Sequence, residues 1–222
     1  RVLDLLHRVK YEQDGSLTFR RSCAHGVCGS DAMLINGRNR LACKLRIEQL
    51  GKRRITVAPL PGLPVIKDLV VDMDGFFDKF KSVQPYLVTE SPAPERERLQ
   101  SAEEHARYED TTKCILCAAC YSECNSLAAD PEFVGPAAFA WGYRFAADER
   151  DGQRKNRAKL YSGDHGVWDC TRCMYCNERC PKGVDPRDAI EKLGGIAFNE
   201  GVSWADAGAR HAKAFLISMR TG

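Results

Sequence analysis

The sequence predicts an α+β fold of two domains, a small β-rich domain followed by a larger helical one. The strand-like segments and a hairpin signal lie before residue 61, whereas helical patterns with proline start signals dominate the second half. Between them, residues 89–100 (TESPAPERERLQ) combine prolines with alternating charges and interrupt the hydrophobic pattern. The 222 residues leave room for both domains, which we place at residues 1–88 and 101–222.

The N-terminal domain is expected to begin with a helix and continue with short strands. Apolar residues at helical spacing mark the helix, namely Val2, Leu3, Leu5, Leu6 and Val9. Asp14-Gly15-Ser16 marks a turn before a strand at residues 16–21 (SLTFRR). Asn36-Gly37 predicts a hairpin between AMLI and RLAC. Residues 53–60 (RRITVAPL) form a further predicted strand before the turn PGLP.

The second domain is expected to be helical. Pro136 can occupy the first position of a helix in residues 136–151 (PAAFAWGYRFAADERD). Its aromatic residues form an apolar stripe that we expect to face the core rather than a cofactor, and they are Phe139, Trp141, Tyr143 and Phe145. Asp185 followed by Pro186 resembles a helix start, and the glycines of DAIEKLGG suit its end. Residues 203–206 (SWAD) begin the last predicted helix.

Two runs of four cysteines share the spacing C-x2-C-x2-C-x3-C. The first run is Cys114, Cys117, Cys120 and Cys124, and the second is Cys170, Cys173, Cys176 and Cys180. This spacing is typical of paired cubane iron–sulfur clusters, in which the fourth cysteine of each run ligates the other run's cluster. We therefore expect one cluster on Cys114, Cys117, Cys120 and Cys180, and another on Cys170, Cys173, Cys176 and Cys124. Such clusters indicate an electron-transfer protein.

Structural zinc is the main alternative, because four-cysteine zinc sites also use C-x2-C pairs. Zinc ribbons space their pairs more widely and need no interleaving of eight cysteines, so we favour iron–sulfur clusters. Disulfides fit poorly, because eleven is an odd number of cysteines and no signal-peptide pattern is visible at Arg1.

The remaining cysteines, Cys23, Cys28 and Cys43, indicate a third site. The plant-type [2Fe–2S] spacing is C-x4-C-x2-C with a distant fourth cysteine, and here Asp31 stands at the third position. Four protein ligands are needed, so either Asp31 supplies a carboxylate oxygen or His25 supplies a ring nitrogen. We favour Asp31, since His25 lies inside the x4 loop. A turn-capping role is the simpler alternative for Asp31.

These sites define the two predicted domains more closely. The first is a plant-type ferredoxin-like (β-grasp) domain, and the second is an α-helical bacterial-ferredoxin-like domain. Gly26 and Gly29 suit a cluster loop, because glycine accepts left-handed torsions and lets backbone N–H groups approach sulfide. A domain of the first kind ordinarily has a β-hairpin ahead of its first helix, so we expect the natural protein to begin upstream of Arg1.

Composition argues against several other functions. A formal net charge of +3 and a pI near 8.3 do not indicate nucleic-acid binding. The mean hydropathy is −0.39, and no apolar run approaches the roughly 18 to 20 residues that span a bilayer, so membrane association is expected only through partners. The five histidines are scattered. No nucleophile or general-base motif is present, and we expect no catalytic residues.

The order of these parts resembles the iron–sulfur subunits of succinate dehydrogenases and fumarate reductases, the complex II family. The resemblance spans nearly the whole chain and rests on SCAHGVCGSDAMLINGRNRLAC, DLVVDM, TTKCILC, GPAAFAWGYRFAADERD and CPKGVDPRDAI. Members of this family also carry aspartate at the third [2Fe–2S] ligand position, which favours Asp31.

The resemblance implies a relay from the FAD of a partner flavoprotein, through [2Fe–2S], [4Fe–4S] and a third cluster, to a quinone at membrane anchor subunits. The dicarboxylate active site would lie on the flavoprotein. The implied location is peripheral, on the cytoplasmic face of the bacterial cytoplasmic membrane. We favour a succinate:quinone oxidoreductase. The alternatives are a quinol:fumarate reductase, or an adaptor for a related flavoprotein dehydrogenase or thiol-dependent fumarate reductase.

One departure from the family concerns the third cluster. The common member holds [3Fe–4S] on cysteines matching Cys124, Cys170 and Cys176 and has no cysteine matching Cys173. Because the full run is present here, we favour a second [4Fe–4S] cluster over [3Fe–4S]. The added negative charge should lower the reduction potential, which would suit a low-potential acceptor such as menaquinone.

A second departure concerns the quinone end. Many members follow the cysteine matching Cys124 with proline and then tryptophans of the quinone pocket, whereas this chain has NSLAA at residues 125–129. Trp168 is the candidate for the quinone vicinity, and ordinary packing is an equal alternative for it. The acceptor could therefore be quinone in an altered site or a cysteine-rich anchor protein.

Overall fold

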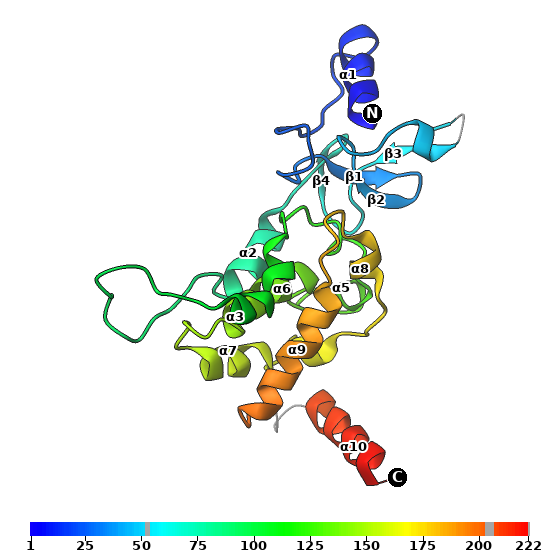
Figure 1. The fold of residues 1–222 in the computed structure, drawn as a ribbon. Helices are drawn as coiled ribbons and strands as arrows, with labels where there is room; N and C mark the ends of the chain where they lie inside the picture. The colour runs from blue at the N-terminus through cyan, green and yellow to red at the C-terminus, as the bar shows by residue number, and fades with distance from the viewer. Residues whose placement is uncertain (52–53, 203–206, 222) are drawn as a thin grey trace.

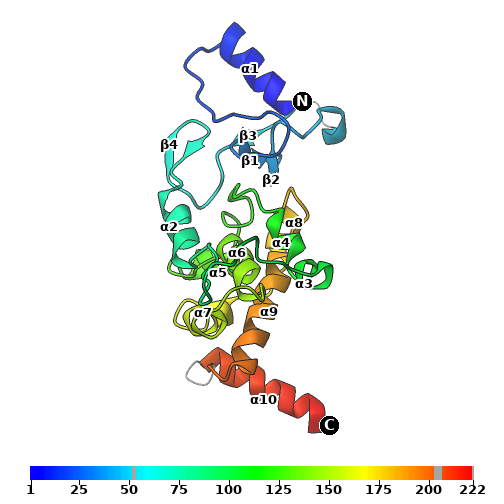
Figure 2. The ribbon, with the colours of Figure 1, turned by 60° about the vertical axis from the view of Figure 1, so that its left-hand side comes forward.

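The protein is elongated, with the N-terminal helix α1 at one end and the C-terminal helix α10 at the other (Figures 1 and 2). The computed structural model describes residues 1–51, 54–202 and 207–221. The N-terminal helix and small sheets lie at one end, most helices form the middle, and the C-terminal helix lies at the far end. The fold is α+β, as the sequence predicts.

Within residues 1–51 and 54–71, the N-terminal part holds one helix, one 3-10 helix and two antiparallel sheets. Its elements are α1 (Val2–Glu12), β1 (Ala32–Ile35), β2 (Arg38–Leu41), η1 (Glu48–Leu50), β3 (Val57–Ala58), β4 (Val65–Lys67) and β5 (Val70–Val71). The strand β1 lies between β2 and β3, and β4 pairs with β5. The predicted hairpin is confirmed, because Asn36 and Gly37 join β1 to β2 with φ of 49° and 75°, the left-handed torsions of a tight turn.

Two strand predictions differ from the structure. Residues 16–21 form no strand, because this segment makes too few hydrogen bonds with residues 68–69 to build a ladder. The Thr18 N–H donates to the Asp68 carboxylate (2.7 Å), and the Leu69 N–H donates to the Thr18 carbonyl (3.2 Å). Within the predicted strand 53–60, only Val57–Ala58 pairs with β1. Pro59 has no N–H to continue the ladder, and Arg53 lies outside the described residues.

The rest of the chain is helical. Its elements are α2 (Asp74–Ser82), α3 (Ala102–Ala106), α4 (Glu109–Thr112), α5 (Asn125–Ala129), α6 (Pro136–Ala146), α7 (Arg154–Tyr161), η2 (Val167–Asp169), α8 (Tyr175–Arg179), α9 (Pro186–Asn199) and α10 (Ala207–Thr221). Residues 89–100 contain no helix or strand and belong to a long loop that projects from the helical body (Figure 1).

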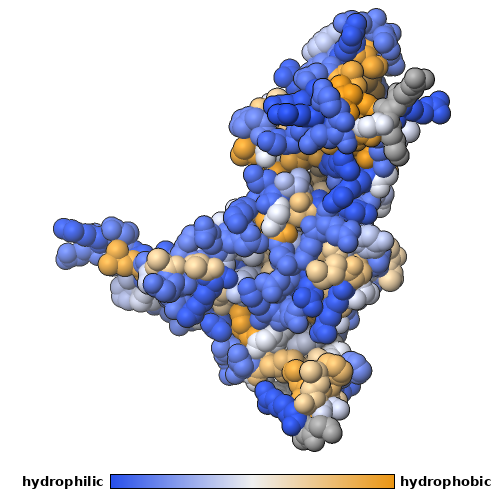
Figure 3. All heavy atoms as spheres, turned by 45° about the vertical axis from the view of Figure 1, so that its right-hand side comes forward, coloured by the Kyte–Doolittle hydropathy of each residue, from blue (hydrophilic) through white to orange (hydrophobic). Residues whose placement is uncertain are grey.

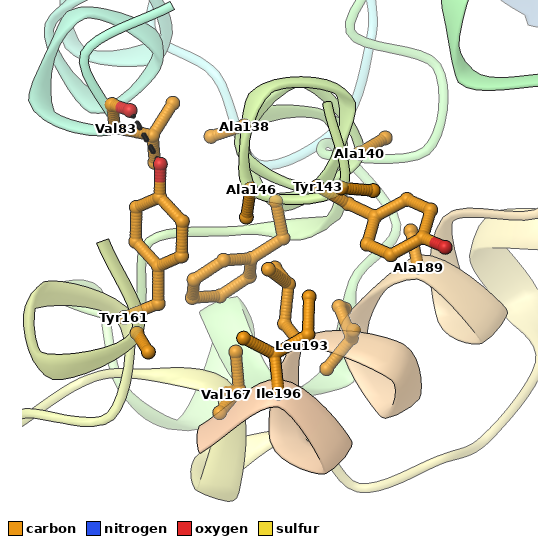
Figure 4. Packing of buried hydrophobic residues seen from close by; sticks show 14 of the residues in the cluster. Val83, Ala138, Ala140, Tyr143, Ala146, Tyr161, Val167, Ala189, Leu193 and Ile196 are labelled. Carbon is orange, nitrogen blue, oxygen red and sulfur yellow. Dashed lines mark hydrogen bonds between the residues drawn. The ribbon is translucent and has the colours of Figure 1, made fainter. Parts of the chain in front are cut away.

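Helix α6 is the centre of the helical core, where it packs against α9 and α7 (Figure 4). Phe139, Tyr143 and Phe145 are buried, which confirms the core prediction for these three, whereas Trp141 is only partly buried. They do not form one stripe, because residues two apart lie about 200° apart around a helix. Nearly every side of α6 is buried instead, and alanines on it let the neighbouring helices approach closely.

Helix α9 begins as predicted but ends later. The Asp185 side chain accepts the Asp188 N–H (2.8 Å), and Pro186 takes the first helical position. The prediction that the paired glycines end this helix is wrong, because α9 continues to Asn199. Gly194 lies against the indole of Trp168, where an added Cβ would be 3.1 Å from the ring. The predicted start of the last helix, residues 203–206, lies outside the described residues.

Candidate metal centres

The loop at residues 23–31 directs backbone N–H groups at one thiol. The Cys23 sulfur accepts hydrogen bonds from the N–H groups of His25 (3.5 Å), Val27 (3.4 Å) and Cys28 (3.3 Å). These bonds lower the pKa of Cys23 to about 6, because they stabilise the thiolate. Gly26, with φ of 81°, lets the loop curl around the sulfur. A thiol that ionises this readily suits iron ligation.

Asp31 is buried beside Cys43, with 2% of its surface exposed. Its Oδ2 accepts the Cys43 N–H, while Oδ1 has no hydrogen-bond partner within the described residues. A buried carboxylate oxygen is costly unless a donor or cation meets it. Burial, reinforced by this carboxylate, raises the pKa of the Cys43 thiol to about 12. The geometry thus favours Asp31 as a cation ligand, and its bond to Cys43 also orders the loop.

His25 is placed less well for ligation. Its side chain is exposed, and its Nδ1 lies 2.6 Å from the carbonyl oxygen of Cys23. The ring is therefore engaged by the loop backbone on the outside of the site. This contact favours Asp31 over His25 as the fourth donor.

The first helical-domain cavity gathers thiols from both cysteine runs. It is lined by Cys114, Cys117 and Cys120 of the first run and by Cys180 of the second. Most of its other wall residues are apolar, including Ala137, Ala140 and Val184. Four thiols facing an apolar cavity match the donor set that soft, thiolate-bound metal centres require.

The second cavity has the complementary set. It is lined by Cys170, Cys173 and Cys176 of the second run and by Cys124 of the first. The two cavities are neighbours, because Cys120 and Cys176 belong to one buried cluster. The chain therefore brings the thiols together in the crossed arrangement that the spacing predicts, and their ligation of clusters stays a prediction.

The two runs also share one backbone conformation. Leu116 (φ 52°) and Ala118 (φ 58°) flank Cys117 in the left-handed region, and Arg172 (φ 56°) and Met174 (φ 68°) occupy the same positions around Cys173. Non-glycine residues adopt this region uncommonly. Its recurrence at matching positions means that the local backbone presents Cys173 as it presents Cys117. Cys173 differs in being exposed.

Burial makes the cavity thiols difficult to ionise without a metal. It raises the pKa of Cys117 and of Cys176 to about 12, and that of Cys120 well above its usual value. A buried thiolate needs positive charge beside it, and iron supplies that charge. The donor sets therefore fit iron–sulfur groups.

Comparison with known proteins agrees with these sites. Residues 1–78 match a 2Fe-2S iron-sulfur cluster binding domain, and residues 110–184 match a 4Fe-4S dicluster domain. The succinate dehydrogenase iron-sulfur subunit of Coxiella burnetii is 46% identical over 183 residues, which cover 82% of this chain and 77% of the relative. This chain belongs to the succinate dehydrogenase and fumarate reductase iron–sulfur subunit family.

This chain is also similar in sequence to other members of this iron–sulfur subunit family and similar in fold to a solved structure. The fumarate reductase iron-sulfur subunit of Mycobacterium tuberculosis is 42% identical over 193 residues, which cover 86% of this chain and 78% of the relative. The solved Mycobacterium smegmatis Sdh1 complex in the apo form contains a chain of the same fold, with a TM-score of 0.82 and 27% identity. The match covers 92% of this chain and 87% of that one.

The segment that follows Cys124 in this family member is the short helix α5, and Trp168 lies nearby in η2. The Trp168 ring packs on Gly194 and lies 5.0 Å from the ring of Phe198. It also lines a cavity of about 720 Å³ between η2, α9 and α10. Apolar side chains of α10, including Phe215 and Leu216, form another wall of this cavity. Trp168 thus packs on α9 and also lines this cavity.

Hydrophobic surface gathers at this end of the molecule, over α10 (Figure 3). No helix among the described residues is both long and apolar enough to cross a bilayer. The role of Trp168 near a quinone stays a prediction.

The sequence pattern did not reveal the residues that join the two cluster-binding parts. Asn39 on β2 donates a hydrogen bond to the Ala119 carbonyl (2.9 Å), and Gly29 lies against Cys117. One signal was available: in the strand RNRL, Asn39 shares its face with buried Leu41, where a polar residue is unexpected.

Proposed function

We propose that this chain is the electron-transfer subunit of a succinate:quinone oxidoreductase, relaying electrons from a partner's FAD through three iron–sulfur sites to quinone. The observation that carries the proposal is that the first site contacts the second and the second contacts the third. Gly29, next to Cys28, lies against Cys117, and Cys120 of the first cavity shares a buried cluster with Cys176 of the second. A relay needs closely spaced redox centres and no acid–base residues.

Three ligand sets follow from the site geometry. For [2Fe–2S] we propose Cys23, Cys28, Asp31 and Cys43. For [4Fe–4S] we propose Cys114, Cys117, Cys120 and Cys180. For the third cluster we propose Cys124, Cys170, Cys173 and Cys176. When bound, such clusters supply one-electron redox chemistry, and the chain supplies ligands, hydrogen bonds and exclusion of water.

We propose a second [4Fe–4S] group for the third site. The support is the matching left-handed torsions around Cys117 and Cys173, which present the two thiols in the same way. A fourth thiolate adds negative charge and lowers the reduction potential of the site. That potential would suit an acceptor of low potential, such as menaquinone.

The partners and the location are part of the same proposal. We expect a flavoprotein that carries the dicarboxylate active site, together with a membrane anchor or a cysteine-rich anchor protein. The chain would then lie on the cytoplasmic face of the bacterial membrane, held there by its partners. The fumarate reductase name of the Mycobacterium tuberculosis relative supports the reverse direction, quinol to fumarate, as the second candidate.

The test is purification of the native complex under anaerobic conditions, followed by identification of its subunits and an assay of succinate-linked dye reduction. We expect a flavoprotein that oxidises succinate and electron paramagnetic resonance (EPR) signals from three clusters. A complex whose flavoprotein does not oxidise succinate, or a protein that holds zinc in place of iron, would contradict the proposal.

A further inference from the structure

The two cluster-binding parts meet at a buried polar contact. Asn39 is 2% exposed, and its Nδ2 donates to the Ala119 carbonyl (2.9 Å) and to the Ser122 hydroxyl (2.6 Å). Ala119 is fully buried and lies between Cys117 and Cys120. The hydrogen bond therefore ties β2 directly to the backbone of the loop that presents the first cavity's thiols. Because a carbonyl only accepts hydrogen bonds, the side-chain amide must face it with its nitrogen.

A second contact brings the two ligand loops together at a glycine. Gly29 follows Cys28 and has φ of 72°. A Cβ added to Gly29 would lie 2.8 Å from the Cβ of Cys117 and 2.9 Å from the carbonyl oxygen of Ile115. Real Cβ atoms are not found so close to backbone atoms, so any larger residue must push the two loops apart. Gly29 thus allows a closer approach of the two loops than any residue with a Cβ would allow.

We propose that Gly29 and Asn39 are positioning residues that set the separation between the [2Fe–2S] site and the neighbouring [4Fe–4S] site. The inference rests on the proposed function, because it assumes that both sites hold clusters. Electron tunnelling slows steeply as the gap between two centres widens. Gly29 lets the two ligand loops approach closely, and Asn39 holds the loop of Cys117 and Cys120 through its directional hydrogen bond to the Ala119 carbonyl.

A purely structural role for the same residues predicts something different. A glycine with positive φ is strained by any replacement, and a buried asparagine stabilises an interface simply by being paired. If the role is purely structural, substitutions at Gly29 and Asn39 should lower stability. In the fraction of each variant that folds, the magnetic interaction and the electron-transfer rate between the two centres should be unchanged. The test therefore needs a readout of distance.

The first experiment compares Gly29→Ala with Gly37→Ala in the assembled complex. Gly37 is the matched control, because its φ is 75° and an added Cβ would meet nothing within 4 Å. The readouts are iron and sulfide content, midpoint potentials, the magnetic interaction between the two reduced clusters by EPR, and the rate of reduction of the second cluster. For Gly29→Ala we expect full iron and sulfide content, a weaker magnetic interaction and a rate that stays several-fold slower after any change in the midpoint potentials is taken into account. Gly37→Ala should match the natural protein.

The second experiment keeps the inference testable if Gly29→Ala fails to assemble. Asn39→Asp preserves the size of the side chain, but a carboxylate cannot donate to the Ala119 carbonyl. We expect the same weaker interaction and a several-fold slower rate. Ser122→Ala is the control, because it removes one acceptor and leaves the bond to Ala119 in place.

The outcomes separate the two proposals. If the natural complex lacks either EPR signal, the proposed function fails, and the inference fails with it. If both signals are present and Gly29→Ala or Asn39→Asp has the magnetic interaction and rate of its control, only the inference is overturned.

Discussion

At the scale of single residues, Cys173 distinguishes this chain from the common pattern of its family. Its neighbours Arg172 and Met174 repeat the left-handed torsions that flank Cys117, yet its side chain is the exposed one of its site. An exposed ligand is the one most easily lost, because water can replace it. The nuclearity of the third cluster therefore depends on this residue.

Cys173→Ala should convert the third cluster from [4Fe–4S] to [3Fe–4S], because three thiolates hold only three corners of the cube. The expected observation is a new [3Fe–4S] EPR signal in the oxidised protein, with the loss of one iron per chain. The midpoint potential of the site should rise, because the cluster type changes and cluster type is one of the properties that set the potential. Tyr175→Phe, at an exposed neighbour outside the lining of this cavity, should leave the EPR signal, the iron content and the midpoint potential unchanged. A [3Fe–4S] signal already present in the intact natural protein would contradict this prediction.

Asp31 and His25 give a second comparison at this scale. Asp31→Asn keeps the size of the side chain but removes its charge, so the [2Fe–2S] signal should be lost or strongly shifted. Asp31→Cys restores the spaced cysteine pattern and should retain the cluster. His25→Ala should retain it too, because the ring lies on the exposed side of the loop. Retention of the signal in Asp31→Asn together with its loss in His25→Ala would reverse the assignment.

At the scale of elements, the two glycines of α9 have different roles. A Cβ added to Gly194 would lie 3.1 Å from the indole of Trp168, whereas a Cβ added to Gly195 would meet nothing within 4 Å. Gly195→Ala should stabilise the helix by about 0.5–1 kcal/mol, the usual gain of alanine over glycine inside a helix. Gly194→Ala should gain less or destabilise, because the packed Trp168 ring must move. Anaerobic urea unfolding followed by circular dichroism measures both, and equal gains would contradict the packing role.

The same helix shows what the sequence could and could not predict. Its start was predictable, because the Asp185 cap and Pro186 act through local chemistry. Its end was not predictable, because Gly194 makes room for the ring of Trp168 and does not mark a helix terminus. The strand predicted at residues 16–21 failed for a similar reason, since a ladder depends on the partner strand as much as on the segment itself.

In the candidate sites, too, the features set by local sequence were predictable and those set by tertiary contacts were not. The cysteine spacing predicted which thiols would gather, because each run sets its own loop geometry. The contacts of Asn39 and Gly29 were not predictable, since they depend on how closely the two parts of the chain approach. The burial of Asp31 with one oxygen unpaired likewise needed the fold around Cys43.

At the scale of the whole molecule, the chain between α2 and the loop at 89–100 is held by one buried ion pair. Arg157 is 1% exposed and binds Asp151 through two hydrogen bonds (3.0 and 2.9 Å). The same guanidinium donates to the carbonyls of Gln84 (2.8 Å) and Tyr86 (2.6 Å). Asp151 in turn accepts the N–H of Val88 (3.0 Å). Together with the hydrogen bond from the Gly152 N–H to the Val88 carbonyl (2.8 Å), this pair fixes residues 83–88 to α7 and to the helical core.

Arg157→Met tests whether this pair fixes the segment that leads from the N-terminal part into the helical core. It leaves Asp151 as a buried unpaired charge and removes the donor of the Tyr86 carbonyl, so we expect a loss of about 3–5 kcal/mol in the free energy of unfolding. Limited proteolysis should cut faster within residues 89–100, because the segment before them is released. Arg157→Lys should be intermediate, since an ammonium cannot reproduce the two-pronged bond to the carboxylate.

Arg154→Met is the matched control on the same helix. Arg154 is partly exposed, with its Nε 3.3 Å from a Glu200 carboxylate oxygen, so its loss should cost only about 0–1 kcal/mol. Anaerobic urea unfolding and the proteolysis rate give both comparisons. If Arg157→Met were as stable and as resistant as Arg154→Met, residues 83–88 would have to be held by the apolar contacts of Val83 and by its bond from the Tyr161 hydroxyl (2.7 Å). Because those contacts lie at Val83, and the Gly152 N–H bonds only the Val88 carbonyl (2.8 Å), Gln84 and Tyr86 depend on the Arg157 guanidinium for their contact with α7, which is why we expect the ion pair to dominate.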